Sequence, residues 1–365
     1  MLKINSKNER IKRKYLNWLE DARRKDVKTT TQVAAAISLF EQSTGNRDFT
    51  AFHFEQARKF KRDLEKATNE KTGKPLSETT IRSRLQILKA FIEWLSDQPG
   101  YKSKVDFTDA AYFSPSGRQD RIAAASREKP FPSLAQIRHV ITTAPDETSI
   151  EKRDRALIAF AILTGMRDAA LASLPVGKVN MARREVFQDA RVVNTKNSKT
   201  MKTFFFPVGD DFVKIIEEWV AYLKTELLFA ETDPLFPKTE TGLNEDGVFA
   251  ALGLTREYWT DASAIRRIFR ERFEVSGLSY FHPHSFRKTL AHLAYDLNLG
   301  LRDSKAWSQN LGHEKADTTW TSYGTLPDHQ TGEIMAGLMD KKTAPSESPP
   351  PEALEWMKRQ VERGQ

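Results

Sequence analysis

Six side chains in this 365-residue sequence are of types that can act together on an anionic reaction centre. Two are arginines, whose planar guanidinium can hold two anionic oxygens at once and stays charged at any working pH. Two are histidines, which donate hydrogen bonds or move protons near neutral pH. A lysine and a tyrosine complete the set, and a phenol oxygen can act as a covalent nucleophile. The six residues are Arg167, Lys199, His284, Arg287, His313 and Tyr323.

Five of these residues lie in three short segments. Arg167 follows a glycine that ends an apolar stretch in LTGMRDAALASL. His284 and Arg287 form an H-x-x-R arrangement in HPHSFRKTL. The segment LGHEKADTTWTSY contains His313 and, ten residues later, Tyr323. No single segment is specific, but the ordered set is.

The order and separation of these segments resemble the tyrosine recombinase (phage integrase) family over about residues 10–340. KTMKTFFFP, between the first two segments, starts with Lys199, which stands where the family's hairpin lysine usually stands relative to the closing Pro207. The resemblance implies a site-specific DNA recombinase, in which a helical DNA-gripping domain and a catalytic domain form a C-shaped clamp. It implies no metal, ATP or other cofactor.

The implied reaction explains why these residue types occur together. Attack of the tyrosine phenol on a DNA phosphodiester would form a covalent 3′-phosphotyrosyl link that preserves the bond energy for rejoining. The two arginines would stabilise the extra negative charge on the pentacoordinate phosphorus. The histidines would donate hydrogen bonds or move protons. Lys199, on a hairpin tip that can enter the minor groove, would protonate the departing 5′ oxygen.

Taken singly, these residues also have structural explanations. His282, His284 and His292 could bind a metal ion, although the chain has no cysteine and no H-E-x-x-H motif. His313 and Tyr323 could each be a packed residue at a helix end. The complete ordered set favours the recombinase.

Three features depart from the family pattern. Ala170 stands where a glutamate is common, so another acid, with Asp168 as the candidate, would have to fix the first arginine. The interval from the second histidine to the tyrosine is one residue longer than usual. Two other lysines, Lys196 and Lys202, share the turn with Lys199, which we favour because its spacing to the closing proline fits best.

The periodicity predicts the elements that position these residues. We expect a buried helix over 156–165, a β-hairpin over 184–208, and helices over 212–228 and 261–275. The predicted fold is mainly α with a small β-sheet, an α+β catalytic domain spanning 133–342.

Four helical patterns precede this domain and predict a helical core-binding domain at 1–110; the clearest begins after Ser77. This region holds 23 basic and 15 acidic residues, a balance of +8 that equals the net charge of the whole chain. Such a basic module indicates contact with nucleic acid or another anionic surface, or a solvated face without a partner. The Pro, Ser and Gly content predicts an interdomain linker at 111–132, and a tether with a short helix at 343–365.

Candidate phosphate contacts lie on the third and fourth predicted helices and on the hairpin. The alternative is that half of those on the helices only keep the helices soluble. The candidates are Arg58, Lys59, Lys61, Arg62, Arg82, Arg84, Lys89, Lys196 and Lys202.

Composition excludes other classes of protein. With 39% hydrophobic and 29% charged residues, the chain is not globally disordered, and without cysteine it has no disulfide framework. The start lacks the apolar core of a signal peptide, and no stretch approaches the ~20 apolar residues of a membrane span. We expect a cytoplasmic protein that joins the nucleoid when bound to DNA.

The resemblance also implies partners. Family members act as tetramers on two double-stranded DNA sites, with a C-terminal segment passed to a neighbouring subunit and with accessory DNA-bending proteins in some systems. Here an apolar run could dock in that way, or pack on its own domain. The run consists of Ile334, Met335, Leu338 and Met339.

Two other functions stay open. A type IB topoisomerase-like relaxase uses a related residue set, although the small helical domain favours recombination. A recombinase-derived DNA-binding regulator without activity would be free to lose Tyr323 or the arginines, and this chain has all three.

Overall fold

The computed structural model describes residues 4–70, 72–115, 117, 121, 130–313 and 331–336. The chain divides into two compact units, Met1–Arg127 and Glu128–Gln365. Each unit has its own hydrophobic core. In the part of the chain that is described, no helix is long and apolar enough to cross a membrane.

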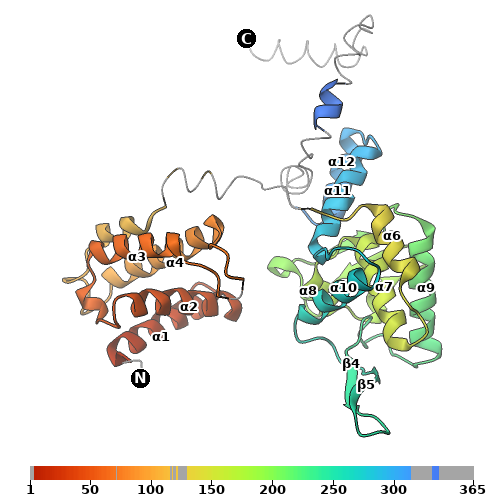
Figure 1. Ribbon diagram of the computed structural model, residues 1–365, viewed down its shortest axis with the longest axis horizontal. Coiled ribbons are helices and arrows are strands. Elements are labelled where there is room, and N and C mark those ends of the chain that lie inside the picture. The colour runs from red at the N-terminus through yellow and green to blue at the C-terminus, as the bar shows by residue number, and fades with distance from the viewer. Residues whose placement is uncertain are drawn as a thin grey trace, which may run out of the picture. The chain divides into compact units, whose positions relative to one another are not determined.

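The first unit is helical (Figure 1). Ser77 caps the fourth helix through the Thr80 amide, at the start that the sequence predicts. The packed unit extends past the predicted linker start at 111, because Phe113 is fully buried and packs against Phe40 and Phe52. Its elements are α1 (Ser6–Asp21), α2 (Val27–Ser43), η1 (Phe49–Ala51), α3 (Phe54–Lys66), α4 (Glu78–Ser96) and η2 (Phe107–Phe113).

The second unit consists of helices with two small antiparallel sheets (Figure 1). Its helices are α6 (Leu134–Thr143), α7 (Ser149–Thr164), α8 (Asp168–Leu171), α9 (Asp210–Thr225), α10 (Ser263–Val275), α11 (Phe286–Asp296) and α12 (Leu301–Asn310), with 3-10 turns η3 (Val176–Lys178), η4 (Lys196–Ser198) and η5 (Pro283–Ser285). Its strands are β1 (Val179–Asn180), β2 (Glu185–Gln188), β3 (Met201–Phe204), β4 (Thr239–Leu243) and β5 (Phe249–Leu254).

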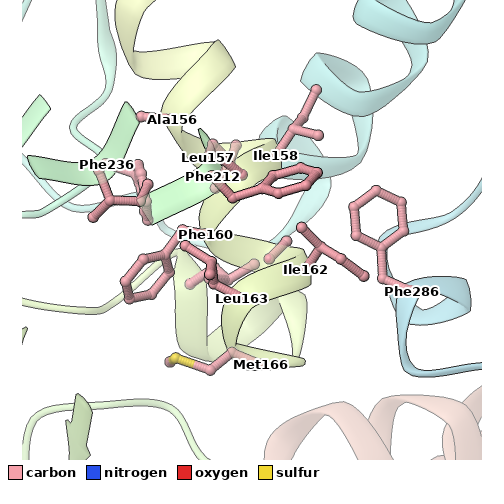
Figure 2. Close-up of a cluster of buried hydrophobic side chains, with 14 of the residues drawn as sticks. Ala156, Leu157, Ile158, Phe160, Ile162, Leu163, Met166, Phe212, Phe236 and Phe286 are labelled. Carbon is pink, nitrogen blue, oxygen red and sulfur yellow. The ribbon is translucent and has the colours of Figure 1, made fainter. Parts of the chain in front are cut away.

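Helix α7 forms the centre of the second unit, in contact with α6, α9, α10 and α11. Every residue from Ala156 to Thr164 is buried, so the helix is apolar on all sides, as Figure 2 shows for its contacts with Phe212 and Phe286. It begins earlier than predicted, at a capping box formed by Thr148 and Glu151. This central helix is therefore a fixed base for whatever follows its C-terminus.

The predicted hairpin is present as β2 and β3, which pair antiparallel with Val186 opposite Thr203, and β1 adds a third strand. A second hairpin, β4–β5, was not predicted. Its apolar residues Leu243 and Phe249 are exposed, so its strands lack the clear inside–outside alternation that identifies a half-buried strand.

Candidate active site

The turn after α7 places Arg167. Gly165 adopts a left-handed φ of 58°, and a Cβ there would lie 2.8 Å from Leu311 Cδ2 and 2.9 Å from Leu290 Cδ1. The position therefore requires glycine both for its backbone conformation and for space. Arg167 follows as the N-cap residue of α8 and lines a cavity. Within the described residues, no side-chain hydrogen bond or ion pair holds its guanidinium.

Arg287, in the first turn of α11, is only 2% exposed. Its Nη1 donates to the Gly165 carbonyl at 2.6 Å, and its Nη2 donates to the Leu311 carbonyl at 2.6 Å and to His313 Nε2 at 2.7 Å. These bonds use three of the five N–H donors of a guanidinium. Because the two carbonyls lie at the ends of α7 and α12, one cation joins two helix C-termini, where the helix dipoles favour positive charge.

The sequence Leu311-Gly312-His313 ends α12 in a Schellman motif. Gly312 has a φ of 75° and its amide donates to the Gln309 carbonyl at 2.8 Å, while the His313 amide donates to the Ser308 carbonyl at 3.2 Å. A Cβ on Gly312 would approach Met201 Sδ to 2.6 Å. The helix end thus fixes the backbone of His313, and its 6%-exposed side chain points to Arg287.

Both histidines are neutral at pH 7. A guanidinium only donates, so His313 Nε2 accepts and its neutral ring carries the proton on Nδ1. Burial, followed by the charges of Arg287 and Arg167, lowers the pKa of His313 to about 3. The same causes, in the same order, lower the pKa of His284 to about 4. The side chain of His284 is nevertheless more exposed than that of His313.

The 3-10 turn before α11 holds His284. His282 caps this turn, since its Nδ1 accepts from the His284 amide at 3.1 Å. His292, the third histidine of the metal alternative, is buried and stacks on Phe131 with ring centroids 4.4 Å apart. In the described ranges, no group of three or more His, Cys, Asp or Glu side chains is arranged to hold a metal ion.

The hairpin brings two of its three candidate lysines to the cavity. Lys196 and Lys199 line it, as does Thr203 on β3. Lys202 does not line it and pairs with Glu185 at 3.2 Å, because successive residues of a strand point to opposite faces. Of the three lysines, Lys196 and Lys199 are therefore placed to reach a phosphate in this cavity.

The cavity has a volume of about 350 Å³ and collects four of the six predicted catalytic residues: Arg167, Lys199, Arg287 and His313. His284 is not among its lining residues, although both arginines act on its ring. Tyr323 lies outside the described residues.

Among the contacts of the described residues, none joins the Asp168 carboxylate to the Arg167 guanidinium, the contact that the alanine at position 170 had suggested. Asp168 Oδ2 accepts from Arg266 Nε at 2.6 Å, which joins α8 to α10. Ala170 is buried and lines the cavity. Asp168 therefore fixes the short helix rather than the guanidinium.

Sequence reasoning missed several polar residues that line the cavity. Gln188 Nε2 donates to Thr203 Oγ1 at 2.7 Å, and Asn310 lines the cavity at the end of α12. Thr195 Oγ1 is buried and has no hydrogen-bond partner in the described structure. The alternation of β2 and β3 could have identified the first pair, but no local signal marks Asn310.

A match to the phage integrase family model covers residues 133–329, more than half of the chain. The chain belongs to the phage integrase family. This confirms the predicted family, and places the chain among enzymes that cleave and rejoin DNA strands.

The curated relatives have low sequence identity to this chain. Tyrosine recombinase XerC of Lactobacillus leichmannii is 26% identical over 267 residues, which cover 72% of this chain and 77% of that protein. Tyrosine recombinase XerC of Corynebacterium efficiens is 28% identical over 178 residues, and the chain spans about half of that protein's length (48%).

Two solved structures share the fold, each at 14% identity. One is a lambda integrase dimer bound to a COC′ core site, with a TM-score of 0.58 over 86% of this chain and 94% of that one. The other is the Tn1549 transposon integrase in complex with a circular intermediate DNA, with a TM-score of 0.57 over 90% and 99%. They confirm the mainly α fold with small sheets.

The candidate DNA-binding cations of the first unit differ in whether they already form an ion pair or a hydrogen bond within the protein. Lys59 and Arg62 on α3 are exposed, and within the described residues no ion pair involves either. Arg58 pairs with Glu55 at 2.8 Å, and Lys61 Nζ donates to the Ser114 carbonyl at 2.7 Å. Lys89 on α4 lies 3.9 Å from Glu93. Arg82 and Arg84 are half-buried on the same helix.

Proposed function

We propose that this integrase-family chain is a site-specific DNA recombinase that integrates or excises a mobile element through a covalent 3′-phosphotyrosyl link at Tyr323. The observation that carries the proposal is the single cavity that gathers Arg167, Arg287, His313 and the hairpin lysines from four separate segments. A phosphate bound there would meet the two guanidiniums and the ammonium groups of the hairpin. We assign the domains at 1–110 and 133–342 to DNA binding and catalysis.

The proposed cleavage step balances without a cofactor. The Tyr323 oxygen forms a bond to phosphorus, and its proton passes to a neutral imidazole or to water. The P–O5′ bond breaks, and the ammonium of Lys199 or Lys196 protonates the departing oxygen. Rejoining reverses these steps with a 5′ hydroxyl as the nucleophile, so the number of phosphoester bonds is unchanged.

The two arginines have different parts in this proposal. Arg167 can turn its whole fork to the non-bridging oxygens, because no described partner holds it. Arg287 is held by Gly165, Leu311 and His313, so it supplies charge from a fixed place and at little reorganisation cost in the transition state.

A nicked suicide substrate tests the proposal. A duplex is first selected from a random-sequence pool by binding to the full chain, and is then nicked so that the cleaved fragment diffuses away. We expect a denaturant-resistant protein–DNA adduct that is lost in Tyr323→Phe and retained in the control Tyr295→Phe. If no selected duplex yields a Tyr323-dependent adduct, the chain is a binding protein and the proposal is wrong.

Product analysis separates recombination from relaxation. Plasmids that carry the selected site should exchange strands with a second site, whereas a topoisomerase-like enzyme would relax a supercoiled plasmid that lacks the site. A circle that carries one site should insert into a second plasmid, and two sites in one plasmid should release the segment between them. Relaxation without exchange would favour the topoisomerase alternative.

We further propose a homotetramer on two DNA sites, with exchange of a C-terminal segment. Ile334 and Met335 are exposed in the helical stretch 331–336, which supports a role in docking; Leu338 and Met339 lie outside the described residues. The tail at 344–365 is a second candidate for exchange, and its deletion should weaken synapsis and recombination while single-site binding persists. Unchanged recombination would discard the role of this tail.

A further inference from the structure

Residue Asn310 connects the two sides of the cavity. Its Oδ1 accepts from the Phe204 amide at 2.7 Å, and its Nδ2 donates to the Phe204 carbonyl at 2.8 Å. Phe204 is the last residue of β3, and Asn310 is the last residue of α12. The side-chain amide thus pairs with the free edge of β3 as a neighbouring strand would, although 106 residues separate the two positions.

The geometry requires an amide group at this position. Only a group that accepts and donates at once can satisfy both the N–H and the C=O of the same strand residue. An aspartate would keep the bond from the amide but would face the Phe204 carbonyl with a second acceptor. A leucine of similar volume would make neither bond.

The connection lies close in sequence to residues of the proposed reaction on both sides. Asn310 precedes His313 by three residues, and β3 starts two residues after Lys199. A second contact supports it, because Met201 lies so near Gly312 that an added Cβ would be 2.6 Å from its sulfur. The relative position of the hairpin strand and the helix end is therefore set at two points, one of them a specific pair of hydrogen bonds.

The other end of the strand is held separately. The Phe206 amide donates to the Leu163 carbonyl at 2.7 Å, which fixes the exit of the hairpin to α7. Phe206 also packs on Trp307 of α12, with ring centroids 4.7 Å apart. Loss of the Asn310 bonds should therefore leave the hairpin folded and shift β3 against α12.

We propose that Asn310 is a positioning residue that holds the hairpin lysine at the leaving oxygen of the phosphate bound by the arginines. The proposal rests on the recombinase function above. Both polar atoms of the Asn310 amide are engaged by Phe204, so in this proposal Asn310 acts through β3 on Lys199 or Lys196. Its loss should impair the protonation of the 5′ oxygen more than the stabilisation of charge on phosphorus.

A pair of substrates separates these two effects. The selected duplex is made with either the normal 5′ oxygen or a bridging 5′ sulfur at the cleaved phosphate, because a thiolate leaves without needing a proton. For Asn310→Leu we expect adduct formation on the oxygen substrate to fall by about 10- to 100-fold, the cost of a small misplacement of a catalytic group. On the sulfur substrate the rate should stay within about threefold of the original chain, since no general acid is needed.

Matched variants calibrate the result. Lys199→Ala and Lys196→Ala identify the lysine that protonates the 5′ oxygen, because its variant should be slow on the oxygen substrate and normal on the sulfur substrate. Arg167→Ala should be slow on both substrates. Asn310→Asp, which keeps one of the two bonds, should be intermediate on oxygen and normal on sulfur, and it replaces the leucine variant if that chain does not fold.

Two outcomes overturn the proposal: equal losses on both substrates, which indicate a general structural defect, or unchanged rates on both. Failure of the original chain to form a Tyr323-dependent adduct on either substrate would instead contradict the recombinase function.

Discussion

The structure holds the candidate DNA-binding cations of the first unit and the cations of the cavity differently. Lys59 and Arg62 are exposed on a helix face. In the cavity, Arg167 is the N-cap residue of α8, directly after the glycine turn that ends α7, and Arg287 is buried and donates to two backbone carbonyls. Diffuse charge attracts a polyanion at long range, whereas placed charge acts on one phosphate. The loss on removing a cation should therefore be larger in the cavity than on the exposed face of α3, and largest for the bonded Arg287.

The cavity repeats this contrast on a smaller scale. The side at the helix ends is buried and is held by the hydrogen bonds of Arg287 to Gly165, Leu311 and His313. The hairpin tip at η4 is exposed, and Asn197 and Ser198 have φ values of 58° and 51°. Such left-handed residues cost roughly 1–2 kcal/mol each. We therefore expect the helix ends to be preorganised and the tip to adjust when DNA binds.

Replacement of Arg287 should have the largest effect. Arg287→Lys keeps a charge but cannot reach both helix-end carbonyls and His313 with a planar fork. Adduct formation should fall by at least about a thousandfold, and the free energy of unfolding of the second unit by about 3 kcal/mol, because buried carbonyls lose their partner. Hydrogen exchange in α11 and α12 measures the second effect. Full stability in this variant would show that the bonds to the helix ends do not hold the site together.

Removal of the Arg167 side chain should affect activity alone. Arg167→Ala is expected to slow adduct formation by about a hundred- to a thousandfold, the usual loss for one preorganised donor to a transition-state anion. The same variant should unfold within about 0.5 kcal/mol of the original chain, because no described partner is left unsatisfied. A marked loss of stability would mean that this arginine is also structural and would remove the distinction between the two.

The buried side should respond to pH. His313 is neutral in the folded chain with a pKa of about 3, against an ordinary value of about 6.5 in the unfolded chain. The stabilisation is complete above pH 6.5 and is lost as the pH falls from there toward 3, because only the unfolded chain then binds the proton. His313→Gln retains an acceptor for Arg287 but cannot titrate.

Hydrogen exchange in α12 between pH 7.5 and 4.5 checks this prediction. The original chain should lose stability with a slope steeper than that of His313→Gln by up to about 1.4 kcal/mol per pH unit, which corresponds to one proton. Parallel slopes would show that His313 becomes protonated over the same pH range in the folded and unfolded chains, and would contradict the lowered pKa.

Much of the site could be predicted from the sequence because local signals mark it. Gly165 and Gly312 end helices, and each precedes a predicted residue, Arg167 or His313, by one or two positions. These are short-range rules of helix termination. The strand alternation that turns Lys202 away from the cavity that Thr203 lines is equally local.

What could not be predicted depends on contacts across the chain. The sequence assigns Arg287 to phosphate, but its bond to Gly165 spans 122 residues and makes it a structural residue as well. The Asn310 pair with Phe204 and the ion pair of Asp168 with Arg266 are of the same kind. No periodicity encodes such pairs, because they depend on how the elements pack. The exposed β4–β5 hairpin was missed for the opposite reason, since it packs too little to leave an alternating pattern.

The smallest effect should come from the exposed cations of the first unit. Lys59→Ala with Arg62→Ala removes two candidate phosphate contacts from α3 and leaves every described bond intact. DNA affinity should fall about ten- to a hundredfold, which corresponds to about 0.7–1.4 kcal/mol for each of the two charged contacts. The fall should be similar for selected and random duplexes, because phosphate contacts carry no sequence information.

Salt dependence distinguishes this effect from a general loss of charge. The slope of log Kd against log salt should decrease by about two, one for each lost contact. Lys102→Ala with Lys104→Ala is the matched control, since it removes the same charge from exposed positions of the same unit beyond α4. If the control lowers the salt slope as much as the α3 pair does, the first unit binds DNA through its overall charge, unlike the individually placed cations of the cavity. If only the α3 pair lowers the slope, the first unit also binds phosphates through cations at specific positions.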